Sequence, residues 1–137
     1  MLDRERAARV VATVERELLT PYGLRSLARS DAQYVARYEG GPVERDGSYH
    51  QGTVWGWLMG PFITAYVKSH GRSEESRRRA DTMLDPLREH LKRAGLGHVS
   101  EIFDAEPPHR PRGCVAQAWS VAELLRAYVE DVQDKRP

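Results

Sequence analysis

Apolar residues recur at helical spacing in four separate segments of the chain, which limits the fold to a small array of amphipathic helices. Evidence for strands is weak, and only residues 97–103 read as a short extended piece. The sequence therefore predicts an all-α fold. The four expected helices cover about residues 3–19, 53–70, 73–95 and 115–131.

Residues at the ends of these segments support the helices. Asp3 and Ser73 are favourable N-caps, and Gly71 is a natural helix end. Pro61 and Pro86 fall inside the second and third segments. Each is expected to kink its helix, because proline lacks the N–H donor and crowds the preceding turn.

The connections between the four helices differ in length. Only a few residues around Gly71 join the second to the third, so these two helices are expected to be antiparallel neighbours. The other two connections, residues 20–52 and 96–113, are long. In an up-and-down array both lie at the same end, and long loops in compact domains are commonly functional. The sequence therefore predicts two long loops that converge on one binding end.

The totals of the sequence exclude several classes of protein. A chain of 137 residues forms one domain at most, and its formal net charge of +1 gives no case for nucleic acid or an anionic membrane as partner. No apolar run approaches the roughly 20 residues that a bilayer helix needs, and the charged N-terminus lacks the apolar stretch of a signal peptide. Cys114 is the single cysteine, which suits a reducing compartment. We expect a cytoplasmic protein.

The second long connection contains three carboxylates, Glu101, Asp104 and Glu106, in a stretch with three prolines. Proline stiffens a loop, and a stiff loop can hold a carboxylate in place for acid–base catalysis. Two of these acids could serve as the acid and base of a glycosidase. The alternative is that all three are merely solvated, as most loop acids are.

The first long connection ends in aromatic and hydrogen-bonding side chains, from Tyr49 to Trp57. Such a mixture suits a sugar, because a pyranose offers apolar C–H faces for stacking and hydroxyls that need directional partners. The alternative is that Trp55 and Trp57 belong to the core and that His50 is a loop histidine with satisfied hydrogen bonds.

Other chemistries have weaker support. His50, His98 and His109 could gather around zinc with nearby acids, but no pair has a tight ligand spacing such as His-Glu-x-x-His. We therefore predict no metal site and no cofactor. Cys114 is expected to be a small packed side chain rather than a nucleophile. The sequence has no glycine-rich phosphate loop and no serine elbow.

A series of motifs occurs in order along nearly the whole chain. They are Thr20-Pro21-Tyr22-Gly23-Leu24-Arg25, Tyr49-His50-Gln51-Gly52-Thr53-Val54-Trp55, Ser100-Glu101-Ile102-Phe103-Asp104, Pro108-His109-Arg110-Pro111-Arg112-Gly113-Cys114 and Gln117-Ala118-Trp119-Ser120. Several motifs in register are more specific than any one of them alone. Together they resemble the C-terminal end of the glycogen debranching enzymes, their amylo-α-1,6-glucosidase domain.

The resemblance implies an (α/α)6 toroid around a central sugar pocket. Residues 1–137 would be an incomplete C-terminal segment of it, with about four helices and two long active-site loops. The second and fourth helices would be inner, and the first and third outer. The resemblance also implies inverting hydrolysis of α-1,6-linked glucose, with an α-glucan such as glycogen or limit dextrin as partner.

The resemblance assigns roles to individual residues. Glu101 matches the catalytic general base, which takes a proton from the attacking water. His109 and Arg110 are expected either to position Glu101 or to contact sugar hydroxyls, and Trp119 either to line the pocket or to pack. The substrate-binding residues implied in this way are Tyr49, His50, Gln51, Trp55, His109, Arg110 and Trp119.

Two departures from the family pattern bear on function. Gly56 stands where the family usually has proline, at a cost of about 1 kcal/mol in helix stability. The family's general acid is an aspartate upstream of the region that this chain matches. We therefore expect the chain alone to be inactive and to need an upstream toroid segment or self-association.

Two other functions remain open from the sequence. The first is a non-catalytic carbohydrate-binding or interaction remnant, in which aromatic rings serve only as stacking platforms. The second is a sugar epimerase on a similar helical barrel, with His50 and His109 as acid and base. The order of the motifs argues against the epimerase.

Overall fold

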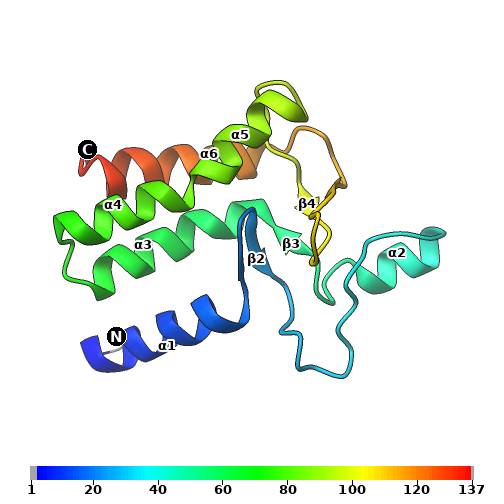
Figure 1. Ribbon diagram of the computed structural model, residues 1–137, viewed down its shortest axis with the longest axis horizontal. Helices are drawn as coiled ribbons and strands as arrows, with labels where there is room; N and C mark the ends of the chain where they lie inside the picture. The colour runs from blue at the N-terminus through cyan, green and yellow to red at the C-terminus, as the bar shows by residue number, and fades with distance from the viewer. Residues whose placement is uncertain (1–2, 137) are drawn as a thin grey trace.

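Helices occupy one end of the molecule, and strands with a short helix occupy the other (Figure 1). The computed structural model describes residues 3–136. Its helices are α1 (Arg4–Glu17), α2 (Pro42–Ser48), α3 (Met59–Ser69), α4 (Glu74–Met83), α5 (Asp85–Arg93) and α6 (Ala118–Ala127). A 3₁₀ turn, Gly56–Leu58, leads into α3, and a π-helical turn, Tyr128–Val132, follows α6.

The helix ends follow from the capping residues. The Asp3 side chain accepts a hydrogen bond from the Arg6 backbone N–H at 2.8 Å, and the Ser73 hydroxyl accepts one from the Ser76 N–H at 3.2 Å. Both predicted N-caps are confirmed. A short turn around Gly71 joins α3 to α4, which lie side by side as antiparallel neighbours (Figure 1).

The expected kink is absent at Pro61, whereas at Pro86 the predicted helix is interrupted. Pro61 is the third residue of α3, in the first turn, where no intrahelical N–H bond is required. Pro86 is the second residue of α5, because the third predicted helix is two helices, with α4 ending at Met83 and α5 starting at Asp85. In both places proline begins a helix, as its fixed φ favours.

The all-α prediction needs correction, because five short strands form an antiparallel sheet in the order β1-β2-β3-β4-β5. Leu24 pairs with Trp55, Val54 with Phe103, and Ile102 with Arg112. Strands of two or three residues carry too little alternation to be recognised in a sequence. The strands are β1 (Leu19–Thr20), β2 (Gly23–Arg25), β3 (Val54–Trp55), β4 (Ile102–Phe103) and β5 (Pro111–Arg112).

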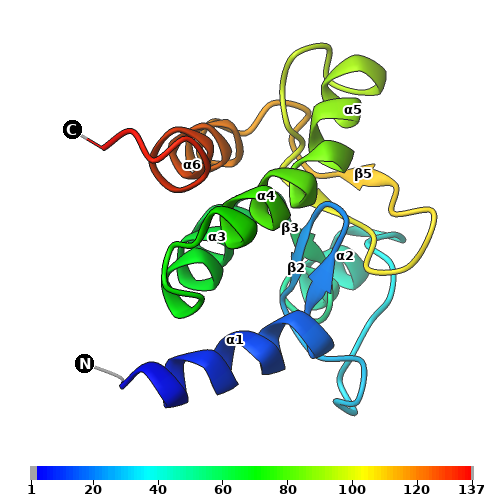
Figure 2. The same ribbon diagram turned by 60° about the vertical axis from the view of Figure 1, so that its left-hand side comes forward.

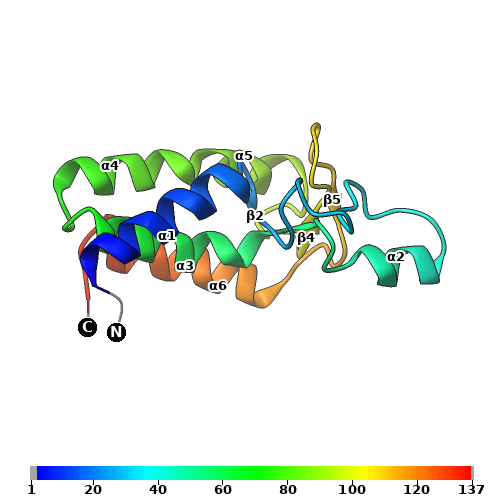
Figure 3. The same ribbon diagram turned by 90° about the horizontal axis from the view of Figure 1, so that it is seen from below.

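This sheet joins the two long connections. β3 pairs on one side with β2 from the first connection and on the other with β4 from the second. The Ala105 N–H also donates to the Ala36 carbonyl at 2.9 Å. The two connections therefore meet at one end of the molecule, as expected from their lengths. The segment that carries α2 projects beyond this end (Figures 1 and 3).

The core lies around α3, which packs against α1, α4 and α6 (Figure 2). Phe62, Ile63 and Val67 of α3 are buried there, with Leu84 and Ala127 from its neighbours. Within residues 3–136, no helix is both long and apolar enough to cross a membrane. The helical layer thus supplies a rigid base from which the two long connections extend.

Candidate functional site

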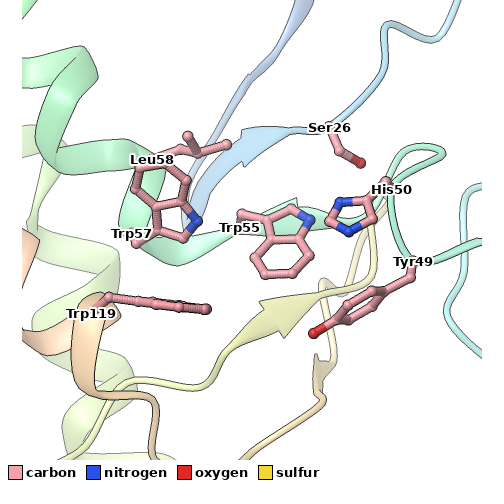
Figure 4. A pocket seen from close by; sticks show the side chains of 7 residues that line it. All are labelled: Ser26, Tyr49, His50, Trp55, Trp57, Leu58 and Trp119. Carbon is pink, nitrogen blue, oxygen red and sulfur yellow. The ribbon is translucent and has the colours of Figure 1, made fainter.

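A cavity of about 780 Å³ opens where the two connections meet the helices (Figure 4). Its lining comes from three parts of the chain: the residue after β2, the segment around β3, and the first turn of α6. Most of the lining side chains are aromatic. The lining residues are Ser26, Tyr49, His50, Trp55, Trp57, Leu58 and Trp119.

The aromatic rings are packed against one another in a fixed arrangement. His50 stacks on Trp55 with ring centroids 4.9 Å apart and an interplanar angle of 1°. Tyr49 meets Trp55 edge-on at 4.8 Å. Trp119 is 51% exposed and contributes its ring from α6, below Trp57 in the view of Figure 4. These rings give the cavity apolar faces of the kind on which sugars stack.

Trp55 is buried as well as aromatic. The residue is only 6% exposed, and its indole N–H is itself buried and has no hydrogen-bond partner within the described part of the chain. A buried donor without a partner costs free energy. Trp55 is thus both a buried residue and a lining residue, and the two functions considered for it from the sequence are not exclusive.

Glu101 lies immediately before β4 and is 7% exposed. The Tyr49 hydroxyl donates to Oε1, and the Cys114 backbone N–H donates to Oε2 at 2.9 Å. Burial raises the pKa of Glu101, but the hydrogen bonds from Tyr49, Cys114 and Gln117 outweigh it, so the pKa lies below its usual value. The carboxylate is therefore ionised at neutral pH, behind the Tyr49 ring that lines the cavity.

Gly113 completes the surroundings of Glu101. Its φ of +67° is left-handed, and a Cβ at this position would collide with Oε2 of Glu101. The next residue, Cys114, is exposed, so the expectation of a packed side chain is wrong. The charge of Glu101 raises the pKa of the Cys114 thiol, which keeps the sulfur protonated and unreactive.

The other two carboxylates of this loop have different surroundings. Asp104 is fully buried and accepts two hydrogen bonds from Arg112, at 3.1 and 3.0 Å. Glu106 accepts hydrogen bonds from Arg29 Nε and from the Tyr34 hydroxyl, both at 2.6 Å. Neither lines the cavity. They are neither merely solvated nor paired with Glu101; instead they fasten the two long connections to each other.

Three of the expected substrate-binding residues lie away from the cavity lining. The Gln51 carbonyl accepts from the Val35 N–H at 2.6 Å, within the turn before β3. His109 Nδ1 lies 3.0 Å from the Asp104 carbonyl, and the exposed Arg110 offers its carbonyl to the Asp104 N–H at 2.9 Å. Of the two histidines considered as the acid and base of an epimerase, His50 lines the cavity and His109 does not. The two therefore do not form an acid–base pair in this cavity.

The remaining expected residues, Tyr49, His50, Trp55 and Trp119, do line the same cavity. Trp57, Ser26 and Leu58 join them without having been predicted. Trp57 could have been found from the sequence, because it lies beside Trp55 in an aromatic segment. Ser26 could not, because only the pairing of β2 with β3 places it near the cavity. Residues 3–136 contain no group of three or more His, Cys, Asp or Glu side chains placed to hold a metal ion.

An aromatic cavity beside a hydrogen-bonded, ionised carboxylate is typical of carbohydrate-active enzymes. Comparison with known proteins agrees with this class. The family model described as amylo-alpha-1,6-glucosidase matches residues 1–126, and the chain belongs to this family. The resemblance seen in the motifs is thereby confirmed.

One curated relative is a glycogen debranching enzyme from Saccharomyces cerevisiae. The two sequences are 33% identical over 72 residues, a match that covers 48% of this chain and 5% of the yeast protein. The chain therefore corresponds to a small part of the length of that relative.

Proposed function

We propose that this chain supplies the general base of an inverting glucosidase that removes α-1,6-linked glucose from glycogen or limit dextrin. The observation that carries the proposal is the placement of Glu101. Its carboxylate does not itself line the cavity but is fixed by two hydrogen bonds, one of them from the lining residue Tyr49, in a chain of the amylo-alpha-1,6-glucosidase family.

The chemistry of inversion needs such a group. A carboxylate base takes a proton from the water that attacks the anomeric carbon, while a carboxylic acid protonates the departing oxygen. The two carboxyl groups of such an enzyme lie roughly 6.5–9.5 Å apart, which leaves room for the water. The base must be ionised before the reaction, and the lowered pKa of Glu101 meets that requirement. The aromatic rings of the cavity would hold the glucose over this water.

The acid partner would come from outside the described residues. Asp104 is held by Arg112 and Glu106 by Arg29, and neither lines the cavity. We therefore propose that the chain is inactive alone and works with an upstream segment of an (α/α)6 toroid, with α3 and α6 as inner helices and α1 and α4 as outer ones. A cytoplasmic location is part of the same proposal, since the free Cys114 suits a reducing compartment.

The test is glucose release from a limit dextrin, measured with the chain alone and with an upstream toroid segment supplied by fusion or in trans. We expect no turnover by the chain alone and turnover by the completed enzyme. Glu101→Gln in the completed enzyme should reduce kcat by at least about 100-fold, as expected for loss of a general base. Near-full activity of Glu101→Gln would refute the proposed role.

Glu106→Gln is the matched control, because it changes a carboxylate of the same loop whose hydrogen-bond partners, Arg29 and Tyr34, do not line the cavity, whereas Glu101 is bonded by the lining residue Tyr49. It should retain most of the activity of the completed enzyme. Robust turnover by the chain alone would contradict the proposed need for an upstream segment. It would indicate that Asp104 or Glu106 serves as the second catalytic carboxylate.

A second function, carbohydrate binding without hydrolysis, is favoured by one observation. The lining of the cavity contains aromatic rings but no carboxylate. Calorimetric titration with limit dextrin would then show binding that Trp119→Ala weakens, while the completed enzyme shows no glucose release. Hydrolysis that depends on Glu101 would exclude this function.

A further inference from the structure

Tyr49 lines the cavity, yet its hydroxyl is already engaged. It follows α2 directly, and its ring is fixed by neighbouring rings of His50 at 4.9 Å, Trp55 at 4.8 Å and Tyr38 at 5.7 Å. From this position the hydroxyl donates to Oε1 of Glu101. A phenol has one hydrogen, so a Tyr49 hydroxyl that donates to Glu101 cannot also donate to a sugar.

The opposite side of the carboxylate is fixed as well. Oε2 accepts the Cys114 N–H at 2.9 Å, and the Glu101 backbone N–H donates to the Cys114 carbonyl at 3.0 Å. These contacts tie the Glu101 backbone and side chain to the same residue. Gly113 leaves the space in which Oε2 lies. The orientation of the carboxylate therefore depends on the Cys114 backbone donor and on the Tyr49 hydroxyl, which is the first of the side-chain hydrogen bonds that lower its pKa, ahead of that from Gln117.

We infer that Tyr49 is a positioning residue for Glu101, which orients the carboxylate and favours its charged form, and that its hydroxyl does not donate to the sugar. This inference rests on the proposed function of Glu101. The ring of Tyr49 still forms part of the cavity wall. What changes is the role of the hydroxyl hydrogen, which acts on the substrate through the base.

The directions of the two pKa shifts agree with this arrangement. Burial and the hydrogen bond to Glu101 raise the pKa of Tyr49, so the phenol stays protonated and remains a donor. The same hydrogen bond lowers the pKa of Glu101. Removing the hydroxyl while keeping the ring should therefore raise the pKa of the carboxyl without disturbing the aromatic packing.

The first experiment measures the pKa of Glu101 in the full chain by NMR, with ¹³C at the carboxyl carbon of glutamate and Glu101→Gln to assign the signal. Tyr49→Phe should raise this pKa by about one unit. Tyr34→Phe is the matched control, because the Tyr34 hydroxyl donates to Glu106 instead. It should leave the pKa of Glu101 unchanged and raise that of Glu106. An unchanged Glu101 pKa in Tyr49→Phe overturns the inference.

A second variant keeps the test decisive if Tyr49→Phe does not fold. Site-specific 3-fluorotyrosine at position 49 makes the hydroxyl a stronger donor with almost no change in shape. The pKa of Glu101 should then fall below that of the unmodified chain. A Glu101 pKa that does not respond overturns the inference.

The second experiment uses the enzyme completed with an upstream segment. Tyr49→Phe should lower kcat with little change in KM, and the acidic limb of the kcat/KM profile should move to higher pH. A raised KM with unchanged kcat would show that the hydroxyl binds sugar and would overturn the inference. If Glu101→Gln stays active, the proposed base fails instead, and the NMR result still decides whether Tyr49 controls the carboxylate.

Discussion

His90 is another buried titratable group close to Glu101. It is 5% exposed, and Nε2 lies 3.3 Å from the backbone N–H of Ser100, the residue before Glu101. Its ring meets Phe103 edge-on at 5.0 Å. Burial lowers the pKa of His90, so the imidazole is neutral in the folded chain and accepts the Ser100 N–H.

This burial makes stability depend on pH. In the unfolded chain His90 takes up a proton as the pH falls through about 6.5, whereas in the folded chain it stays neutral. The free energy of unfolding should therefore decrease below about pH 6.5, by at most about 1.4 kcal/mol per pH unit from this group. Urea denaturation at several pH values between 5 and 8 measures the slope.

The control for this slope is His90→Gln, which keeps an acceptor for the Ser100 N–H and does not titrate. It should flatten the part of the pH dependence that His90 contributes. Equal slopes in the two proteins would mean that the burial of His90 has no role in acid sensitivity.

Gly113 gives a second prediction at the scale of one residue, with Gly97 as its matched control. Both glycines have left-handed φ, but a Cβ on Gly97 would meet no atom within 4 Å, whereas one on Gly113 would collide with Glu101. Gly97→Ala is expected to cost about 1 kcal/mol of backbone strain. Gly113→Ala should cost roughly 1–3 kcal/mol more, from overpacking. Equal losses in chemical denaturation would show that Glu101 moves aside freely.

At the scale of elements, the contact between α3 and α6 is the closest helix crossing near the site. Gly60 is the second residue of α3, and a Cβ there would lie 2.7 Å from the Glu123 carbonyl oxygen and 2.8 Å from its Oε2. Arg126, also on α6, donates to the Thr64 hydroxyl of α3 at 3.2 Å. The backbone of α6 therefore cannot move away from α3 without loosening this contact.

Gly60→Ala should destabilise the chain by roughly 1–3 kcal/mol, because the added methyl meets backbone that has no room to move. Gly47→Ala is the control, since Gly47 lies within α2 and a Cβ there meets no atom within 4 Å. It should stabilise the chain by up to about 1 kcal/mol through helix propensity. Thermal denaturation of both variants measures the two changes in stability. An unchanged midpoint of unfolding in Gly60→Ala would show that α6 can separate from α3.

Most of the helices could be predicted because caps and apolar spacing lie within each segment. The short α2, which lies inside the first long connection, was not predicted, and α4 and α5 were expected to be one helix. The strands could not, because a strand such as β3 exists only through its pairing with β2 and β4, which are far away in the sequence. The start of the second helix was misplaced for the same reason. Val54 and Trp55 continue the apolar pattern of α3 but are buried as a strand.

The candidate site was predictable to the extent that its residues lie in motifs. His50, Trp55 and Trp119 could be identified in this way, and the convergence of the two connections followed from their lengths. The partners of the loop acids could not be identified. Glu106 meets Arg29 and Tyr34 across more than 70 residues of sequence, and no local pattern indicates such a pair.

At the scale of the whole molecule, α6 has an apolar side that no described residue covers. Ala118, Ala122, Leu125 and Val129 are all exposed and follow one another at helical spacing. Leu125 is 60% and Val129 37% exposed. The opposite side of α6 packs on α3, so this helix is apolar around most of its circumference. A helix of that kind is normally buried on both sides.

We therefore expect the chain to self-associate when it is studied alone. Its apparent mass in sedimentation equilibrium and its midpoint of thermal unfolding should both rise with protein concentration, because association stabilises the folded state by mass action. The double variant Leu125→Glu and Val129→Glu should remain helical and shift toward monomer. Val43→Glu, which replaces a valine on α2 that is 81% exposed, should leave the association unchanged. A monomer with a sharp, concentration-independent transition would contradict this expectation, and would mean that the apolar side of α6 is tolerated in water without a partner.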